Sequence, residues 1–182
     1  IFVPLNEIAY GSQSANNFWF GMDITANFTI PEDHRVNGRD MIYEFSGDDD
    51  MWVFIDDVLV LDIGGVHSAI SGNINFTTGK VTEEWRARNF DGQMEGGEIY
   101  HTIEESFRNA GKKWDNSVGS QHTMKIFYLE RGNGASTCKM KFNIPFVPIE
   151  PDYQIDYHAN GGIGTMTGDT VKYGQGYVPK QN

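Results

Sequence analysis

The segment from Ser46 to Asp57 reads SGDDDMWVFIDD, and it joins three adjacent carboxylates to a strongly apolar run typical of a buried strand. Asp48, Asp49 and Asp50 repel one another at the start of such a strand, and burial makes their charges costlier still. Ca²⁺ removes that cost, because it takes about six to eight oxygen ligands and a compact acidic turn supplies several of them. For an arbitrary Asp triplet, the alternative is a solvated acidic loop.

The residues after the acidic turn have the pattern of a β-hairpin. Two apolar runs, Trp52–Ile55 and Val58–Leu61, are separated by Asp56 and Asp57, which tolerate the positive φ of a tight turn. Elsewhere 21 glycines and 6 prolines punctuate short runs rich in Phe, Val, Ile, Thr and Tyr. Further strands are expected over 18–30 (as one strand or two), 41–45, 73–77, 122–129 and 139–146. The sequence therefore predicts a mainly β protein.

Two segments depart from the strand pattern. In Glu98–Asn109 the apolar residues Ile99, Ile103 and Phe107 recur every four residues, which predicts one short helix. The segment Lys80–Gly97 has little periodicity and many polar residues, so we interpret it as a long loop.

Composition and charge exclude several classes of protein. The chain has 182 residues, of which 39% are hydrophobic, enough to build a core rather than a disordered chain. Its net charge of −11 repels phosphate backbones, so we expect no nucleic-acid partner. Its apolar runs are too short for membrane insertion. The single cysteine, Cys138, excludes a disulfide framework.

The chain divides where proline becomes frequent. Residues 145–151 read PFVPIEP, and prolines at this density make a stiff extended connector. The roughly thirty residues that follow contain short strand patterns but cannot bury a core alone. We therefore expect a domain over residues 1–148, and a linker with a truncated β module over residues 149–182.

The acidic strand resembles the PA14 domain, and most closely its fibro-slime branch in bacterial surface proteins. The resembling segments are 47–56, 59–62, 64–67, 71–76, 122–132 and 138–144. The match covers roughly Asn17 to Pro145, most of the chain. It implies a PA14-like antiparallel β-sandwich with long loops and at most one or two short helices.

The resemblance also implies a metal site. Lectin members of that family hold Ca²⁺ with an Asp-Asp pair joined by a cis peptide, and a sugar coordinates the ion through vicinal hydroxyls. Carried onto this sequence, the implied metal ligands are Asp48, Asp49, Gly132, Asn133 and Gly134. Asn133 supplies a side-chain oxygen and the glycines backbone carbonyls, while Glu130 competes with Asn133 for that place. Asp50 and Asp57 replace glycines common in the family, which leaves open a purely structural Ca²⁺ site.

The ligand-binding candidates are grouped around this metal. They are Asp48, Asp49, Asn133, His67, Trp85 and Trp114. His67 lies in a Gly-Gly-Val-His motif, where a lone histidine more often has a hydrogen-bonded structural role. Trp85 and Trp114 fall in polar segments and could stack on a sugar face, although packing onto the core is the favoured role for both.

The tail suggests the setting in which the domain works. Residues 157–166, YHANGGIGTM, with VKYG at 171–174, resemble the start of a Listeria–Bacteroides repeat, a small β module found in arrays on bacterial surfaces. Together the resemblances imply a Ca²⁺-dependent, lectin-like head of an adhesin. That adhesin is expected to be extracellular, anchored to the bacterial cell wall or secreted, and to bind glycans on host or neighbouring cells.

Two other functions compete with the lectin. One is a structural or protein-binding module, with a protein receptor and a purely structural Ca²⁺ site or none. The other is an enzyme, but a glycosidase needs two carboxylates on opposite sides of the bond, whereas the adjacent aspartates share one site. We therefore expect no catalytic activity.

Overall fold

The computed structural model describes residues 4, 18–65, 67–131, 136–148, 152–158, 161, 163–172 and 174–180. The chain splits into two compact units, Ile1–Val147 and Pro148–Asn182. Among the described residues no helix is both long and apolar enough to cross a bilayer.

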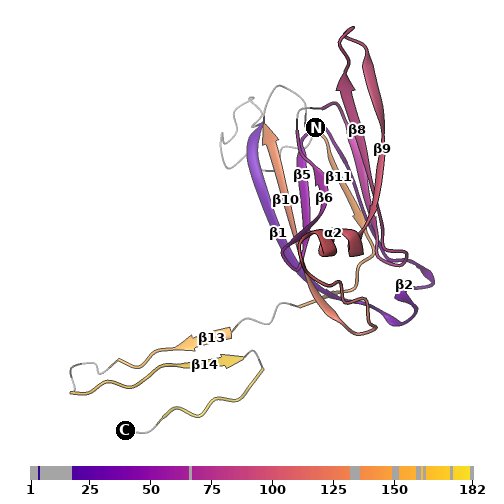
Figure 1. The fold of residues 1–182 in the computed structure, drawn as a ribbon. Coiled ribbons are helices and arrows are strands. Elements are labelled where there is room, and N and C mark those ends of the chain that lie inside the picture. The colour runs from indigo at the N-terminus through magenta and orange to yellow at the C-terminus, as the bar shows by residue number, and fades with distance from the viewer. Residues whose placement is uncertain are drawn as a thin grey trace. The chain divides into compact units, whose positions relative to one another are not determined.

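The first unit is a sandwich of two five-stranded antiparallel sheets. Figure 1 shows how their strands are arranged. One sheet has the order β12-β1-β10-β5-β6, with β1 (Trp19–Thr29), β5 (Asp50–Ile55), β6 (Val58–Ile63), β10 (Gln121–Arg131) and β12 (Phe146–Val147). The other has the order β11-β4-β7-β8-β9, with β4 (Ile42–Gly47), β7 (Ile70–Asn75), β8 (Lys80–Arg88), β9 (Met94–Thr102) and β11 (Cys138–Phe142). The predicted mainly β, antiparallel sandwich is confirmed.

Shorter elements complete the two units. In the first unit they are a 3-10 turn η1 (Glu32–His34), the strands β2 (Arg35–Val36) and β3 (Arg39–Asp40), and the helix α2 (Ile103–Asn109). The second unit contains an antiparallel pair, β13 (Asp152–Ile155) and β14 (Asp169–Lys172). The predicted short strands of the tail fall on this pair.

The core between the sheets follows from strict alternation along the strands. In β10 every second residue from His122 to Glu130 is buried, and β4 and β7 alternate in the same way. Because successive side chains of a strand point to opposite faces, this period places one apolar row of each strand between the sheets. Phe28 and Phe76 meet edge to face there, with ring centroids 5.3 Å apart.

The hairpin prediction is confirmed. Asp56 and Asp57 form the turn between β5 and β6 with φ of 48° and 62°, the left-handed values that a two-residue hairpin turn requires. The predicted strand over 18–30 is the single strand β1.

The prediction of a loop over Lys80–Gly97 is wrong. Most of that segment belongs to the β8–β9 hairpin, in which β8 also pairs with β7. The hairpin rises beyond the sandwich in Figure 1, and residues 86–100 are exposed except for Asn89, which is half-buried. Because so little of it faces the core, its sequence lacks the alternating pattern from which a strand is predicted.

The predicted helix over Glu98–Asn109 is wrong in its first half. The segment up to Thr102 belongs to β9, where Ile99 is exposed, and the helix begins at Ile103. Thr102 fixes that start through a capping box, since its hydroxyl accepts a hydrogen bond from the Glu105 N–H while the Glu105 carboxylate accepts one from the Thr102 N–H.

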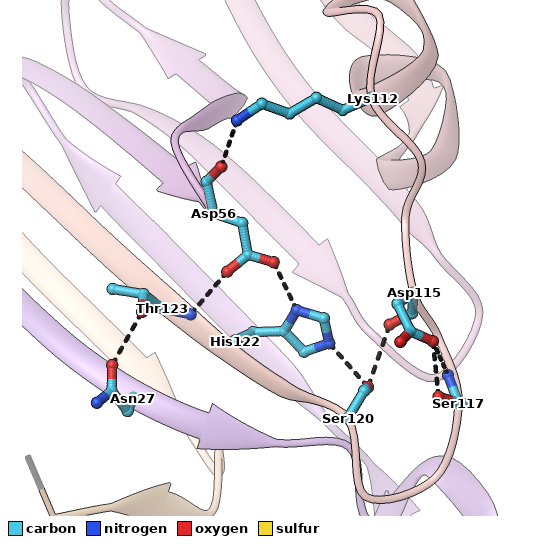
Figure 2. A network of polar contacts seen from close by, with 8 residues as sticks. All are labelled: Asn27, Asp56, Lys112, Asp115, Ser117, Ser120, His122 and Thr123. Carbon is cyan, nitrogen blue, oxygen red and sulfur yellow. Dashed lines mark hydrogen bonds and ion pairs between the residues drawn. The ribbon is translucent and has the colours of Figure 1, made fainter.

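A polar network holds the end of the sandwich at which the β5–β6 turn lies (Figure 2). The Asp56 carboxylate accepts a hydrogen bond from the Thr123 N–H at 2.9 Å and contacts His122 Nδ1 at 2.7 Å. Lys112 donates to the Asp56 carbonyl, so the turn is tied both to β10 and to the loop after α2. These bonds fix the turn in its left-handed conformation.

Thr102→Ala should lower the free energy of unfolding by about 1 kcal/mol, because it removes the oxygen that caps α2. Thr102→Ser keeps that oxygen and serves as the matched control. Urea unfolding of the two variants measures the difference. Equal stability of Thr102→Ala and Thr102→Ser would show that the cap contributes nothing.

Candidate metal centre

The acidic residues of the sequence motif gather at one end of the sandwich. Asp48 and Asp49 form the turn between β4 and β5, and Asp50 begins β5 beside Leu129 of β10. Glu130 follows Leu129 on β10. One carboxylate oxygen from each of Asp48, Asp49 and Glu130 lies within 4.8 Å of the other two.

Backbone contacts hold the turn in place. Gly47 ends β4 against the residues that precede β11, where a Cβ would lie 2.5 Å from the Thr137 carbonyl oxygen, so a side chain does not fit. The Asp48 N–H donates to that carbonyl at 3.3 Å, and the Asp48 carboxylate accepts from the Thr137 N–H at 2.7 Å. The Asp49 carboxylate accepts from the Arg131 N–H at 3.2 Å.

Asp50 is neutralised within the protein. Its side chain is 5% exposed and receives the Arg131 guanidinium at two points, with Nε 2.6 Å from Oδ2 and an Nη 3.0 Å from Oδ1. The Gly65 N–H donates to the same carboxylate. A bidentate, charge-assisted contact of this kind satisfies a buried carboxylate. Asp50 is therefore a structural residue beside the cluster.

Asp49 and Glu130 are two carboxyl groups in hydrogen-bond contact with each other. Glu130 is 1% exposed and accepts a hydrogen bond from the Tyr128 hydroxyl at 3.1 Å. The pKa of Asp49 is raised to about 6, first by burial and then by its hydrogen bond with the Glu130 carboxyl, while the Arg131 N–H opposes the shift. The nearby Glu130 carboxyl therefore makes the ionised form of Asp49 less favourable than it is in water.

The donor atoms of the cluster would suit a calcium ion. All three groups offer hard oxygen donors, which suit Ca²⁺ rather than zinc. Calcium–oxygen distances are about 2.3–2.6 Å, so two ligand atoms on opposite sides of the ion lie about 5 Å apart, which matches the spread of this cluster. Three side chains leave further positions for carbonyls, water or a ligand.

The structure brings some of the predicted metal ligands together and does not describe others. Asp48 and Asp49 lie together as expected, and the competing candidate Glu130 joins them. Gly132, Asn133 and Gly134 lie outside the described residues. The expected cis bond between Asp48 and Asp49 is wrong, because the described peptide bonds include no cis bond.

The alternating burial along β10 could have predicted that the Glu130 side chain points inward, beside the acidic turn. Met124, Ile126 and Tyr128 form the inward row of that strand, and Glu130 is the next member. An acidic residue in an inward row requires a partner, and the acidic turn lies beside it.

The other ligand-binding candidates are not among the three residues of the acidic cluster. The His67 ring contacts the carbonyls of Ser68 at 3.1 Å and Ile63 at 3.5 Å, in the loop after β6. Trp85 lies on β8 with its indole beside Gly97, 38% exposed.

Trp114 packs onto the core between Phe107 and His122, with ring centroids 5.1 and 4.3 Å away. His122 and Glu130 are eight residues apart on β10, which corresponds to about 27 Å. The structure therefore does not bring Trp114 to the acidic cluster.

At that other end, Ser120, His122 and Asp56 are arranged in the order of an acyl-transfer triad, which sequence analysis did not find. His122 Nε2 lies 2.8 Å from Ser120 Oγ (Figure 2). However, Ser120 Oγ also donates to the Asp115 carbonyl at 3.1 Å. A hydroxyl has one hydrogen, so the Asp115 carbonyl competes with Nε2 for it, whereas a nucleophilic serine donates to its general base. The geometry supports a structural network rather than a nucleophile.

Fold and site together define a β-sandwich module with a carboxylate cluster at one end. No family model matches the sequence, and no solved structure is significantly similar to it.

Several proteins of Dictyostelium discoideum are similar to this chain. Protein psiF is 31% identical over 168 residues, which cover 84% of this chain and 20% of psiF. Protein psiB is 26% identical over 150 residues, covering 82% of this chain and 20% of psiB. Protein psiD is 48% identical over 60 residues, covering 33% of this chain and 10% of psiD. The chain thus spans a fifth or less of the length of these relatives.

Removing Arg131 should destabilise the protein more than removing the charge of Asp50. Arg131→Gln leaves a buried carboxylate without its guanidinium and should cost about 3 kcal/mol, whereas Asp50→Asn leaves a half-exposed Arg131 that water can solvate and should cost about 1 kcal/mol. Urea unfolding in EDTA compares the two. A larger loss for Asp50→Asn contradicts this account of the pair.

The raised pKa of Asp49 should make the metal-free protein less stable as pH rises. The folded state binds more protons than the unfolded state between the unfolded value of about 3.9 and the folded value of about 6. In EDTA, the free energy of unfolding should therefore fall across this window relative to Asp49→Asn, which carries no charge at either pH. Asp23→Asn on the exposed face of β1 is the matched control. Parallel pH profiles for wild type and Asp49→Asn would contradict the prediction.

Proposed function

We propose that this chain is a Ca²⁺-dependent carbohydrate-binding module, with Asp48, Asp49 and Glu130 as the side chains that hold the ion. The proposal is supported mainly by one observation, the three carboxylates within 4.8 Å of one another at the end of the sandwich. When bound, the ion supplies positions to which vicinal hydroxyls of a sugar can coordinate.

The chain's own residues prepare this site. The Thr137 backbone orients Asp48, and the Arg131 N–H orients Asp49. The Arg131 guanidinium forms an ion pair with Asp50, so it neutralises Asp50 rather than the three carboxylates of the cluster. Asn133 with its neighbouring glycines remains the proposed source of further ligands.

The proposed setting is an extracellular adhesin at a bacterial cell surface, with glycans on host or neighbouring cells as partners. The support is the resemblance of the acidic strand and of the tail to modules of such proteins. The Dictyostelium relatives do not bear on this setting. A single site of small buried area binds a monosaccharide weakly, and several copies in one adhesin would compensate through avidity.

A specific observation favours a second candidate, a structural or protein-binding module. Glu130 is buried and the acidic turn is fixed by backbone contacts on both sides, which is also the arrangement of a closed structural ion. In that case Ca²⁺ would rigidify the turn, and the partner would be a protein receptor that binds elsewhere.

Calcium titration of EDTA-treated protein should give heat by calorimetry and raise the melting temperature. A ligand at about 100 times its dissociation constant adds about 2.7 kcal/mol to the free energy of unfolding. Asp49→Asn should abolish both effects, and the exposed Asp23→Asn should leave them unchanged. Absence of heat and of a thermal shift in wild type refutes the metal centre.

A glycan array read with Ca²⁺ and with EDTA separates the two candidates. Binding that EDTA and Asp49→Asn both remove supports the lectin. Calcium binding without any glycan bound refutes the lectin and supports the structural ion.

A further inference from the structure

The strand β9 lies at the edge of its sheet, and β8 is its one partner among the described strands (Figure 1). Two backbone hydrogen bonds fix which of its residues face β8. At one end of the hairpin the Asn89 N–H donates to the Gln93 carbonyl, and at the other the Ile103 N–H donates to the Gly79 carbonyl. Hydrogen-bonded pairs alternate along an antiparallel ladder. The odd-numbered residues of β9 therefore bond to β8, and the even-numbered ones turn their N–H and C=O groups to the open edge.

The open edge of β9 is available to another strand. Residues 94–100 are all exposed, and the register of the hairpin contains no bulge that would twist the edge away. Within the described part of the chain, the backbone groups of Glu98 and Tyr100 on this edge have no hydrogen-bond partner. A row of unpaired N–H and C=O groups is a ready template for pairing with another chain.

The edge strand β6 of the other sheet shows how such groups are covered in the same molecule. The Asp62 N–H donates to the Glu83 carboxylate at 2.8 Å, and His101 Nε2 lies 2.9 Å from the Val60 carbonyl oxygen. The β8–β9 hairpin therefore supplies side chains that occupy the edge of β6. The described residues supply no such cover to the middle of β9.

The side chains of β9 are complementary to β9 itself when the strand is read in the antiparallel direction. A two-fold axis perpendicular to the sheet at Ile99 places that residue opposite its own copy. Ile99 is 51% exposed, so the pair buries apolar surface at the centre. Glu98 then lies opposite Tyr100 of the second copy. On the other face Gly97 lies opposite His101, where the missing side chain leaves room for the ring.

The neighbouring two-fold registers are less favourable. An axis at Glu98 sets two carboxylates directly opposite each other, which destabilises a strand pair. An axis at Gly97 leaves no side chains to pair at the centre, and it sets Glu95 opposite the apolar Ile99. The pattern of residues therefore selects the axis at Ile99.

The axis at Ile99 also suits the backbone and the charges of the edge. Glu98 of each copy becomes the hydrogen-bonded partner of Tyr100 in the other, which forms about four backbone hydrogen bonds. Within one copy, the Tyr100 hydroxyl donates to the Glu98 carboxylate, and Lys80 Nζ lies 4.1 Å from the Tyr100 ring centroid. Lys80 thus brings one positive charge toward the axis for each Glu98.

We propose that β9 is a self-association edge, at which a second copy of this chain adds its own β9 in antiparallel register and joins the two five-stranded sheets into one. An unrelated strand could use the same backbone groups, but it would have to supply a matching pattern of side chains, which a second copy supplies by symmetry. The proposal goes beyond the metal centre and does not depend on it, because the acidic cluster contains no residue of β9.

The dimer is expected to be weak. A ladder of a few residues falls short of the roughly 20–30 residues a side of a standard interface. Each copy also carries a net charge of −11, so the copies repel at long range. Association should therefore appear at high protein concentration, and about 0.15 M NaCl is needed to screen charges more than about 8 Å apart.

Sedimentation velocity in EDTA measures this association up to about 1 mM protein. EDTA keeps calcium out, so failure of the edge and failure of the metal centre are seen separately. The wild type should form dimers. Ile99→Lys should weaken the dimer at least about tenfold, because it sets two ammonium groups opposite each other at the axis. Thr25→Lys on the exposed part of β1 is the matched control, and circular dichroism checks the fold of both variants.

Disulfide trapping tests the register. Cys138→Ser first removes the single cysteine. In that background and in oxidised glutathione, Ile99→Cys should give a linked dimer, because opposite residues of a non-hydrogen-bonded pair have Cα atoms about 4.5 Å apart. Met94→Cys is the control, since Met94 is 53% exposed on the same strand. Its two copies lie about 34 Å apart in the proposed register and should not link.

Hydrogen exchange followed by NMR identifies the strand that pairs. The amides of Glu98 and Tyr100 should exchange more slowly as the dimer forms, because they gain partners across the axis. The amides of Gly97 and Ile99 are already bonded to β8, so their exchange should change less.

Three outcomes overturn the proposal. They are a wild type that stays monomeric at about 1 mM, a dimer that Ile99→Lys leaves unchanged, and linking of Met94→Cys as fast as that of Ile99→Cys. A dimer that protects the amides of another strand, and not those of Glu98 and Tyr100, assigns the association to a different surface and refutes the proposal as well.

Discussion

The acidic turn can lie at the end of a packed sandwich only because its carboxylates are stabilised in different ways. An ion buried without compensation costs several kcal/mol. Asp50 avoids that cost through two contacts from Arg131 and one from the Gly65 N–H. Asp48 is bound by the Thr137 backbone. Asp49 shares a hydrogen bond with Glu130, another carboxyl, which raises its pKa to about 6.

β10 connects this turn to the rest of the fold. It pairs with β1 on one side and β5 on the other, so it is an interior strand of its sheet. Its inward row begins at His122 and ends at Glu130, and the residues between them are core. Both termini of the row are polar because each lies where the core ends. His122 joins the network of Figure 2, while Glu130 joins the acidic turn.

Sequence analysis succeeded where local pattern decides structure. The β5–β6 hairpin follows from two apolar runs and two residues that accept positive φ, and Asp48 with Asp49 are neighbours in any fold. Sequence analysis failed where contacts with distant segments of the chain decide the structure. The β8–β9 hairpin is a strand pair because β7 supplies one edge of the ladder, not because its own residues alternate. Trp114 lies far from the acidic cluster because the loop after α2 packs at the other end of β10.

Asp50 and Asp49 have neighbours of opposite charge, and this difference bears on what kind of site the acidic cluster forms. A protein that needed only neutrality at this turn could place a second guanidinium beside Asp49, as it places Arg131 beside Asp50. Instead the described residues bring another carboxyl to Asp49, and that carboxyl is buried. Such a pair is unfavourable when both groups are ionised, and a proton or a metal ion relieves the repulsion.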